Sequence, residues 1–247
     1  MRAGDDCVAV YSMQGPTRNV LVRNLTCYTP LSVTHGHDTS NVTFDGCTVY
    51  GNWGHDATGV RPRWFKTATR VKTDRKTNGT LSDITYRNIR GVDVDLMADI
   101  TSWYPCHNGA LPASCWPRQR TVCRHPVRPP GGGGSPGAAS PPSPSQRPPP
   151  RRHLTSDSVY DNYLECRKFY PVVPGVTSHI KNVLYENLVG ENAWRAAWLN
   201  CLPETPCTGV RFRNFSAPGA LGFACENVHG DADHSTPPAT PCFSSSL

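Results

Sequence analysis

The sequence predicts an all-β fold, a right-handed parallel β-helix, because one short phrase recurs along the chain. The phrase reads Asn or Asp, aliphatic, any residue, apolar or aromatic, any residue, Asn, aliphatic, and its copies start at residues 19, 41, 83, 182 and 209. The interval between the second and third starts is close to twice the interval between the first and second. A period in the twenties indicates a solenoid.

The second observation is that apolar and polar residues alternate within each copy of the phrase. This period of two is typical of a strand with one buried face, and strands that recur once per coil are expected to stack in parallel. No apolar period of the helical kind persists along the chain. An antiparallel β-sandwich is the alternative, since its strands alternate too, but the regular period and the unequal loops favour the β-helix.

Two residue types recur with the repeat. The final Asn falls at the same place in four copies: Asn24, Asn88, Asn187 and Asn214. We expect their amides to form a hydrogen-bonded ladder at a turn. Three cysteines recur at equal intervals: Cys7, Cys27 and Cys47. They either fill the core of successive coils as stacked thiols or form disulfides, and both alternatives stay open.

The middle of the chain has a composition that cannot pack a core. More than half of the positions in the segment 126–152 are Pro or Gly. The chain therefore divides into β-helix coils with a candidate site over residues 1–104, an irregular Cys- and Pro/Gly-rich insertion over 105–160, and C-terminal coils with a tail over 161–247.

Charge and composition narrow the classes of partner. The 126–152 segment has four Arg and no acidic residue, so it supplies +4 of the formal +6 and leaves +2 for the rest. We expect no nucleic-acid partner, because the basic residues gather in a flexible tract. No apolar stretch is long enough to cross a membrane. Metal-like spacing and cofactor motifs are absent, so we expect no metal and no cofactor. We also expect a monomer.

Cysteine usage and sequons indicate the compartment. The chain has eleven Cys and four Asn-x-Ser/Thr sequons, at Asn24, Asn41, Asn78 and Asn214. Both features predict a secreted, disulfide-bonded glycoprotein. The first residues lack the apolar core of a signal peptide, so we expect the chain to be incomplete at its N-terminus.

Several motifs in order carry a family resemblance. They are Gly4-Asp5-Asp6-Cys7, Arg70-Val71-Lys72-Thr73, the repeat starting at Asp83, Cys201 to Cys207, and Cys225-Glu226-Asn227 with Cys242. Together they resemble glycoside hydrolase family 28, the polygalacturonases that degrade pectin. The resemblance covers most of the chain outside about 105–160. It implies a pectin-lyase-like β-helix, an extracellular, cell-wall location and a pectic polysaccharide, polygalacturonate, as partner.

The resemblance also implies roles for individual residues. Hydrolysis of a glycosidic bond needs a proton for the leaving oxygen and a base for the attacking water, and carboxyl groups provide both. Asp5 matches the family's acid, and Asp6 matches a water-activating Asp. Arg70 and Lys72 lie on one face of a strand and match the pair that holds a uronate carboxylate, and Tyr104 matches a substrate-contacting Tyr.

The sequence departs from the family pattern in three places. An upstream Asn-Thr-Asp motif, which holds a third Asp, is absent. No His stands at the family's Gly-His-Gly position, and His35 is the candidate substitute. Arg61, in Gly59-Val60-Arg61-Pro62, also resembles the start of the Arg70 motif, so either Arg61 or Arg70 is the family's Arg.

Two disulfides are expected because each closes a short loop beside a coil: Cys201 with Cys207, and Cys225 with Cys242. The expected function is a polygalacturonase-like glycosidase that cleaves galacturonan by inverting hydrolysis. The competing hypothesis is a catalytically dead carbohydrate-binding or structural β-helix. Because the third Asp and the matching His are missing, we expect this chain to release little reducing sugar. Endo or exo cleavage, and galacturonan or a rhamnose- or xylose-bearing pectin, stay open.

Overall fold

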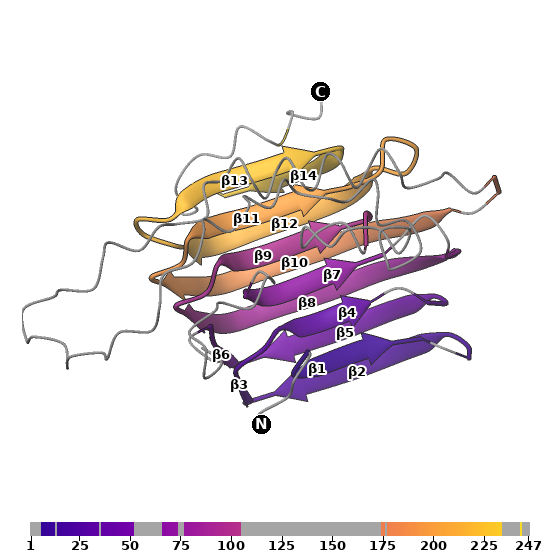
Figure 1. The fold of residues 1–247 in the computed structure, drawn as a ribbon. Coiled ribbons are helices and arrows are strands. Elements are labelled where there is room, and N and C mark those ends of the chain that lie inside the picture. The colour runs from indigo at the N-terminus through magenta and orange to yellow at the C-terminus, as the bar shows by residue number, and fades with distance from the viewer. Residues whose placement is uncertain are drawn as a thin grey trace, which may run out of the picture.

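The described part of the chain consists of β-strands joined by loops. A computed structural model describes residues 6–12, 14–34, 36–51, 66–73, 77–104, 174–175, 177–233 and 243. Fourteen strands and no helix occur in these ranges. Figure 1 shows the strands stacked in chain order from one end of the molecule to the other. Within the described ranges, no helix is long and apolar enough to cross a membrane.

The first sheet has six strands in the order β1-β4-β7-β9-β11-β13. Every neighbouring pair in it is parallel. The strands are β1 (Val8–Tyr11), β4 (Leu31–Thr34), β7 (Thr67–Lys72), β9 (Leu96–Thr101), β11 (Arg195–Asn200) and β13 (Leu221–Glu226).

The second sheet has eight strands and is also parallel throughout. Its main path is β14-β12-β10-β8-β5-β2, and β3 and β6 attach through β8. The strands are β2 (Thr17–Arg23), β3 (Thr26–Cys27), β5 (Thr39–Asp45), β6 (Thr48–Tyr50), β8 (Gly79–Val92), β10 (Ser178–Glu191), β12 (Cys207–Ser216) and β14 (Val228–Ala232).

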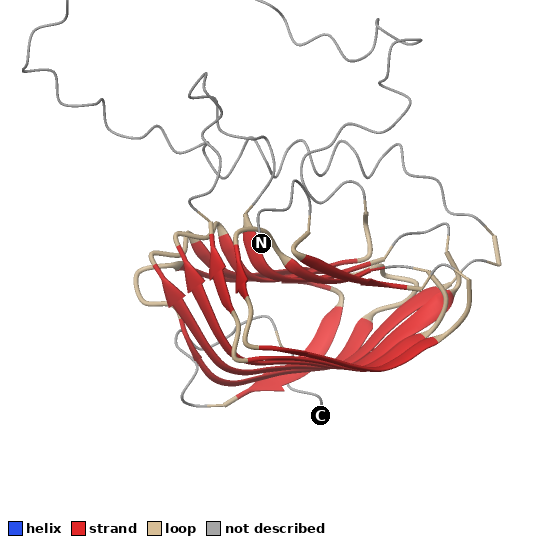
Figure 2. Ribbon diagram, turned by 90° about the horizontal axis from the view of Figure 1, so that it is seen from below, coloured by secondary structure: helices blue, strands red, loops and turns tan. Residues whose placement is uncertain are grey.

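Each coil gives one strand to the six-stranded sheet and then its next strand or strands to the eight-stranded sheet. Figure 2, seen along the stack from its N-terminal end, shows the two sheets facing each other across the interior. The chain is therefore a parallel β-helix, as the repeat predicts. The antiparallel sandwich is excluded, because neighbouring strands in both sheets of the described part are parallel.

One detail of the repeat is wrong in the sequence prediction. Val42 pairs with Ile84 in the neighbouring strand, so the long spacing between the copies at 41 and 83 is a single long coil and not two short ones. The extra chain lies between Gly51 and Lys66, where residues 52–65 are outside the described part. A still longer excursion separates β8 from β10, and the expected insertion over 105–160 lies outside the described residues. Loop-closure entropy grows only slowly with length, so long excursions leave the stacking intact.

The interior is built from equivalent side chains of successive coils. Phe44, Tyr86, Tyr185 and Phe212 form a stack with ring centroids 5.0, 5.4 and 4.7 Å apart and near-parallel rings. All four side chains are fully buried. Burial of large aromatic rings, with this stacking, stabilises the coil register across the middle of the solenoid.

Asparagine ladders form, but within strands and not at turns between coils. Asn88 donates to Asp45, Asn187 to Asn88, and Asn214 to Asn187, at 2.8, 3.1 and 2.9 Å. These three Asn residues have positive φ angles, in the left-handed region that Asn tolerates better than most residues. The ladder position of the second coil is Gly46, also at positive φ, where a Cβ would lie 2.8 Å from the Asn24 Oδ1. The Asn therefore marks a bend in a continuous sheet.

The cysteines adopt both of the arrangements that the sequence left open. Cys7 and Cys27 form a disulfide, while Cys47 is a buried free thiol whose pKa is raised by burial. The expected Cys201–Cys207 disulfide is confirmed, with a Cα–Cα distance of 5.8 Å. Cys225 is disulfide-bonded, and Cys242 lies outside the described residues.

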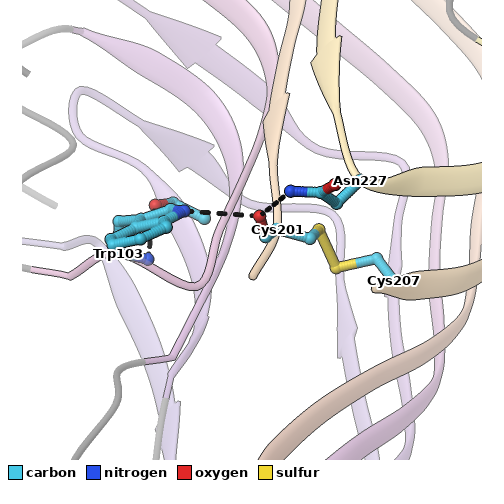
Figure 3. Close-up of a disulfide and its surroundings, with 5 residues drawn as sticks. Trp103, Cys201, Cys207 and Asn227 are labelled. Carbon is cyan, nitrogen blue, oxygen red and sulfur yellow. Dashed lines mark hydrogen bonds between the residues drawn. A yellow bond between two sulfur atoms is a disulfide. The ribbon is translucent and has the colours of Figure 1, made fainter. Parts of the chain in front are cut away.

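The Cys201–Cys207 disulfide joins the end of β11 to the start of β12. The Cys201 carbonyl accepts hydrogen bonds from the Trp103 indole Nε1 at 3.3 Å and from the Asn227 amide at 3.0 Å (Figure 3). These bonds join three successive coils at the edge where the outer face of the six-stranded sheet ends. The chain just after β9, which holds Tyr104, is thereby held in place.

Candidate active site on the outer face of the six-stranded sheet

Strand alternation decides which side chains leave the core in β7 and β9. Val71 and Ile100 belong to the hydrophobic core. Arg70, Lys72 and Asp99 alternate with them and point to the opposite, outer face. Arg70 pairs with Asp99 in the register of neighbouring strands, so these two side chains lie side by side.

Five residues form what we call the charge cluster: Asp6, Arg70, Lys72, Asp99 and Tyr104. The Lys72 Nζ lies 2.9 Å from the Asp6 Oδ2 and 5.1 Å from the centre of the Tyr104 ring. The Arg70 Nε donates to the Asp99 Oδ2 at 3.0 Å, and its Nη1 lies 3.9 Å from the Asp6 Oδ1. Residues from the first, third and fourth coils thus meet in one network.

The cluster is almost closed to solvent. Arg70, Lys72 and Asp99 are 5%, 8% and 4% exposed. Burial raises the pKa of Asp99 from 3.8 to about 6, against the opposing effects of Arg70 and Lys72. The negative charge of Asp6 adds to the rise. Asp99 therefore takes up a proton in mildly acidic conditions, which weakens its hold on Arg70.

A core tyrosine supports the cluster from below. The Tyr86 hydroxyl donates to the Arg70 carbonyl at 2.8 Å and lies 3.3 Å from the Leu31 carbonyl. Tyr86 is fully buried, and its pKa is well above the ordinary value because of burial. The aromatic stack of the interior is thus tied to the backbone of β7 directly beneath the charged side chains.

The structure brings four of the six site residues predicted from the sequence together: Asp6, Arg70, Lys72 and Tyr104. Asp5, His35 and the alternative Arg61 lie outside the described residues. On β4, between β1 and β7, the outer face carries the small buried side chains Ser32 and Thr34. Among the described residues, no group of three or more His, Cys, Asp or Glu side chains is placed to hold a metal ion.

Asp99 is the cluster residue that sequence reasoning missed. The sequence showed it only as a polar residue in an otherwise apolar strand, Leu96-Met97-Ala98-Asp99-Ile100. An Asp in such a strand indicates a nearby cation or hydrogen-bond donor, because a buried carboxylate needs a partner. Its partner was not identifiable beforehand, because β8 and two connecting segments separate β9 from β7 in sequence, and their combined length does not specify which residues of the two strands lie side by side.

The cluster has the chemistry to bind and transform an anionic ligand. Arg70 offers a planar guanidinium, Lys72 a compact positive charge, and Asp6 a carboxylate within reach of both. The Tyr104 ring adds an aromatic surface beside Lys72. The two cations can form charge-assisted hydrogen bonds to an anionic group, and the ring can pack against an apolar surface.

Comparison with known proteins gives one informative similarity. Over 82 residues, which make up 30% of this chain, the chain is 33% identical to Polygalacturonase-2 of Solanum lycopersicum. The matched part spans 18% of the length of that protein. No protein-family model matches the chain, and no solved structure matches it.

Proposed function

We propose that this protein is a glycosidase of the polygalacturonase type that acts on pectic galacturonan at the charge cluster. The observation that carries the proposal is the meeting of Asp6 with Lys72 at 2.9 Å and with Arg70 at 3.9 Å, although the Asp lies far from both cations in the sequence. The similarity to a tomato polygalacturonase supports the same substrate class.

Substrate recognition in this proposal rests on the two cations. Each sugar of a galacturonan carries a carboxylate, and Arg and Lys both bind carboxylates, Arg through two parallel hydrogen bonds. In the cluster, Asp6 and Asp99 already neutralise Lys72 and Arg70. A sugar therefore has to compete with the protein carboxylates for the two cations. A uronate can do this because it is negatively charged, whereas a sugar without that charge is disfavoured.

Hydrolysis in this proposal rests on the adjacent acids. Inverting enzymes place an acid and a base about 6.5–9.5 Å apart to admit the attacking water. We assign the acid role to Asp5 and the water-activating role to Asp6. A general base must be ionised, and Lys72 is the counterion beside the Asp6 carboxylate. The Tyr104 ring contacts the sugar, and His35 takes the place of the family His.

The second candidate is a protein that binds galacturonan without cleaving it. One observation favours it: Asp6 and Asp99, the two described carboxylates of the cluster, are both held in ion pairs with the cations. Under this alternative the cluster recognises uronate and the acids only tune its charge.

The experiment measures reducing-sugar release from polygalacturonate by the wild-type chain and by Asp6→Asn, at a protein concentration high enough to quantify the low rate expected of the wild type. We expect the variant to lose at least about 100-fold in rate, since general acid–base groups contribute about 10²–10⁴-fold. Asp83→Asn is the matched control, because Asn41 and Asn182 occupy the equivalent position in the neighbouring coils. An Asp6→Asn variant that retains full activity would show that the assigned role is wrong.

A binding assay separates the two candidates. Retardation of the protein in a polygalacturonate-containing native gel should weaken about tenfold in Lys72→Gln, because a charge-assisted contact is lost. Arg87→Gln, on the other sheet, should migrate as the wild type does. Binding that depends on Lys72 without any hydrolysis favours the second candidate. The absence of both binding and hydrolysis would contradict both candidates.

A further inference from the structure

The four sequons are not equivalent once the chain is folded. An N-glycan is attached through the side-chain nitrogen of Asn, so that nitrogen has to be reachable and clear of a neighbouring coil. Asn41, Asn78 and Asn214 each have a further coil on both sides, which allows a direct comparison of their amide groups.

Two of these amide nitrogens are part of the inter-coil ladders. The Asn41 Nδ2 donates to the Asn19 Oδ1 at 2.8 Å, and the Asn214 Nδ2 donates to the Asn187 Oδ1 at 2.9 Å. Parallel strands lie about 4.8 Å apart, so a nitrogen that faces the next coil has no room for a pyranose ring beside it. A glycan at either site requires the side chain to swing out and break the ladder.

Asn78 has the opposite arrangement. It lies just before β8, at the corner where the chain passes from the six-stranded sheet to the eight-stranded sheet. All three Asn residues are exposed, so the difference lies in which atom of the amide group is bonded to the neighbouring coil. The Asn78 Oδ1 accepts a hydrogen bond from the Thr177 backbone N–H at 2.6 Å. The oxygen is therefore the anchored end of the amide, and the ladders seen in the described strands do not include the nitrogen.

Glycosylation is compatible with that anchor. The glycan comes from a lipid-linked diphosphate oligosaccharide. The bond between the sugar and the diphosphate breaks, a bond from the sugar to Nδ2 forms, one Nδ2 hydrogen leaves as a proton, and the diphosphate leaves on the lipid. The carbonyl oxygen is unchanged as an acceptor, so the bond from Thr177 survives. The following Gly79 and Thr80 complete the motif in an extended segment, where the Thr80 backbone N–H donates to the Asp38 Oδ1 at 2.8 Å. The modified Asn78 side chain would then project from a fixed corner of the solenoid.

We propose that the folded protein carries an N-glycan at Asn78 and none at Asn41 or Asn214, because a glycan on either of these two nitrogens is incompatible with the ladder hydrogen bond that the nitrogen makes in the folded coils. This modification does not depend on the proposed enzymatic activity. The three sequons have the same sequence pattern, but they differ in whether the amide nitrogen is bonded to a neighbouring coil.

The test uses the full 247-residue chain, secreted with an added leader from a eukaryotic host and purified as a folded monomer. Enzymatic removal of N-glycans in H₂¹⁸O marks each former attachment site as an ¹⁸O-labelled Asp. Tryptic cleavage places Asn78 in the peptide 77–87 and Asn214 in the peptide 214–247, so mass spectrometry distinguishes them. We expect label at Asn78, and none at Asn41 or Asn214.

Sequon variants provide the matched controls. Thr80→Ala should remove one glycan from the secreted protein, and Thr80→Ser should restore it. Thr43→Ala and Ser216→Ala should leave the glycan content unchanged. Label at Asn41 or Asn214 in the folded monomer would overturn the proposal, and so would a secreted chain in which Asn78 is unmodified.

Discussion

The outer faces of the two sheets show how differently one repeat uses its charges. On the eight-stranded sheet, charges of alternating sign follow one another from coil to coil: Arg23, Asp45, Arg87, Glu186 and Arg213. The Arg23 and Arg87 side chains are 54% and 39% exposed. On the six-stranded sheet, the side chains of Arg70 and Asp99 in the charge cluster are each 6% exposed.

Coil stacking places charges in the same register on both faces, while burial decides how much each charge contributes to stability. Exposed ion pairs are screened by water and contribute little. A buried pair contributes little net stability either, but the loss of one partner leaves an uncompensated charge, which is costly. We expect the eight-stranded face to tolerate substitution, whereas the six-stranded face should not.

The largest expected effect comes from breaking the buried pair. Arg70→Met leaves the Asp99 carboxylate without its hydrogen-bonded cation, and we expect the free energy of unfolding to fall by about 3–5 kcal/mol. Arg87→Met on the other sheet should barely move the urea midpoint. The double variant Arg70→Met with Asp99→Leu should recover most of the loss. Equal losses of stability in the two single variants would show that burial does not distinguish the ion pairs of the two faces.

The next effect is a pH dependence that arises from Asp99. Its pKa in the folded chain is about 6, above the ordinary 3.8, so the folded state binds this proton more tightly than the unfolded state. The resulting stability is fully present below about pH 3.8 and is lost as pH rises through 6, by at most about 3 kcal/mol. Relative to Asp99→Asn, wild-type unfolding free energy should fall between about pH 4 and 7. Parallel curves for the two proteins would contradict the assignment.

The smallest expected effect concerns the ladder on the exposed face. Asn88→Ala places a Cβ-bearing residue without a polar side chain at a positive φ, which costs about 1–2 kcal/mol, and removes the amide. Asn88→Gly removes the same amide but keeps the backbone freedom, as Gly46 does in the preceding coil. Chemical unfolding should therefore rank Gly above Ala by about 1 kcal/mol. The reverse order would contradict this explanation, because both variants lack the amide and differ only in how well they tolerate the positive φ.

Much of the fold was predictable, because each coil repeats a local pattern. The alternation around Val42, Ile84 and Val183 predicted strands with one buried face, and all three side chains are fully buried. The coil boundaries were not predictable in the same way. The long spacing between the copies at 41 and 83 resembled two periods, since nothing in the sequence separates a second coil from a long loop of similar length.

The candidate site was predictable only where motif and alternation agreed. The spacing of Arg70 and Lys72 placed both on one face, and the structure has them there, each beside a carboxylate. Asp99 was missed because its role depends on a partner in a different strand. Its pairing with Arg70 follows from the β7–β9 register, which the length of the intervening chain, β8 with its two connections, does not specify.

Local sequence patterns specify the period of two and the recurring Asn, because both depend on residues close together in the chain. Only the folded chain specifies which coils are neighbours. Arg70 meets Asp99, and charges alternate along the eight-stranded sheet, as a result of that stacking. The same stacking engages the Asn41 amide in a ladder, while Asn78 lies outside the ladders. The physical reason is that stacking joins residues far apart in the sequence through backbone hydrogen bonds, which are indifferent to the length of the loops between them.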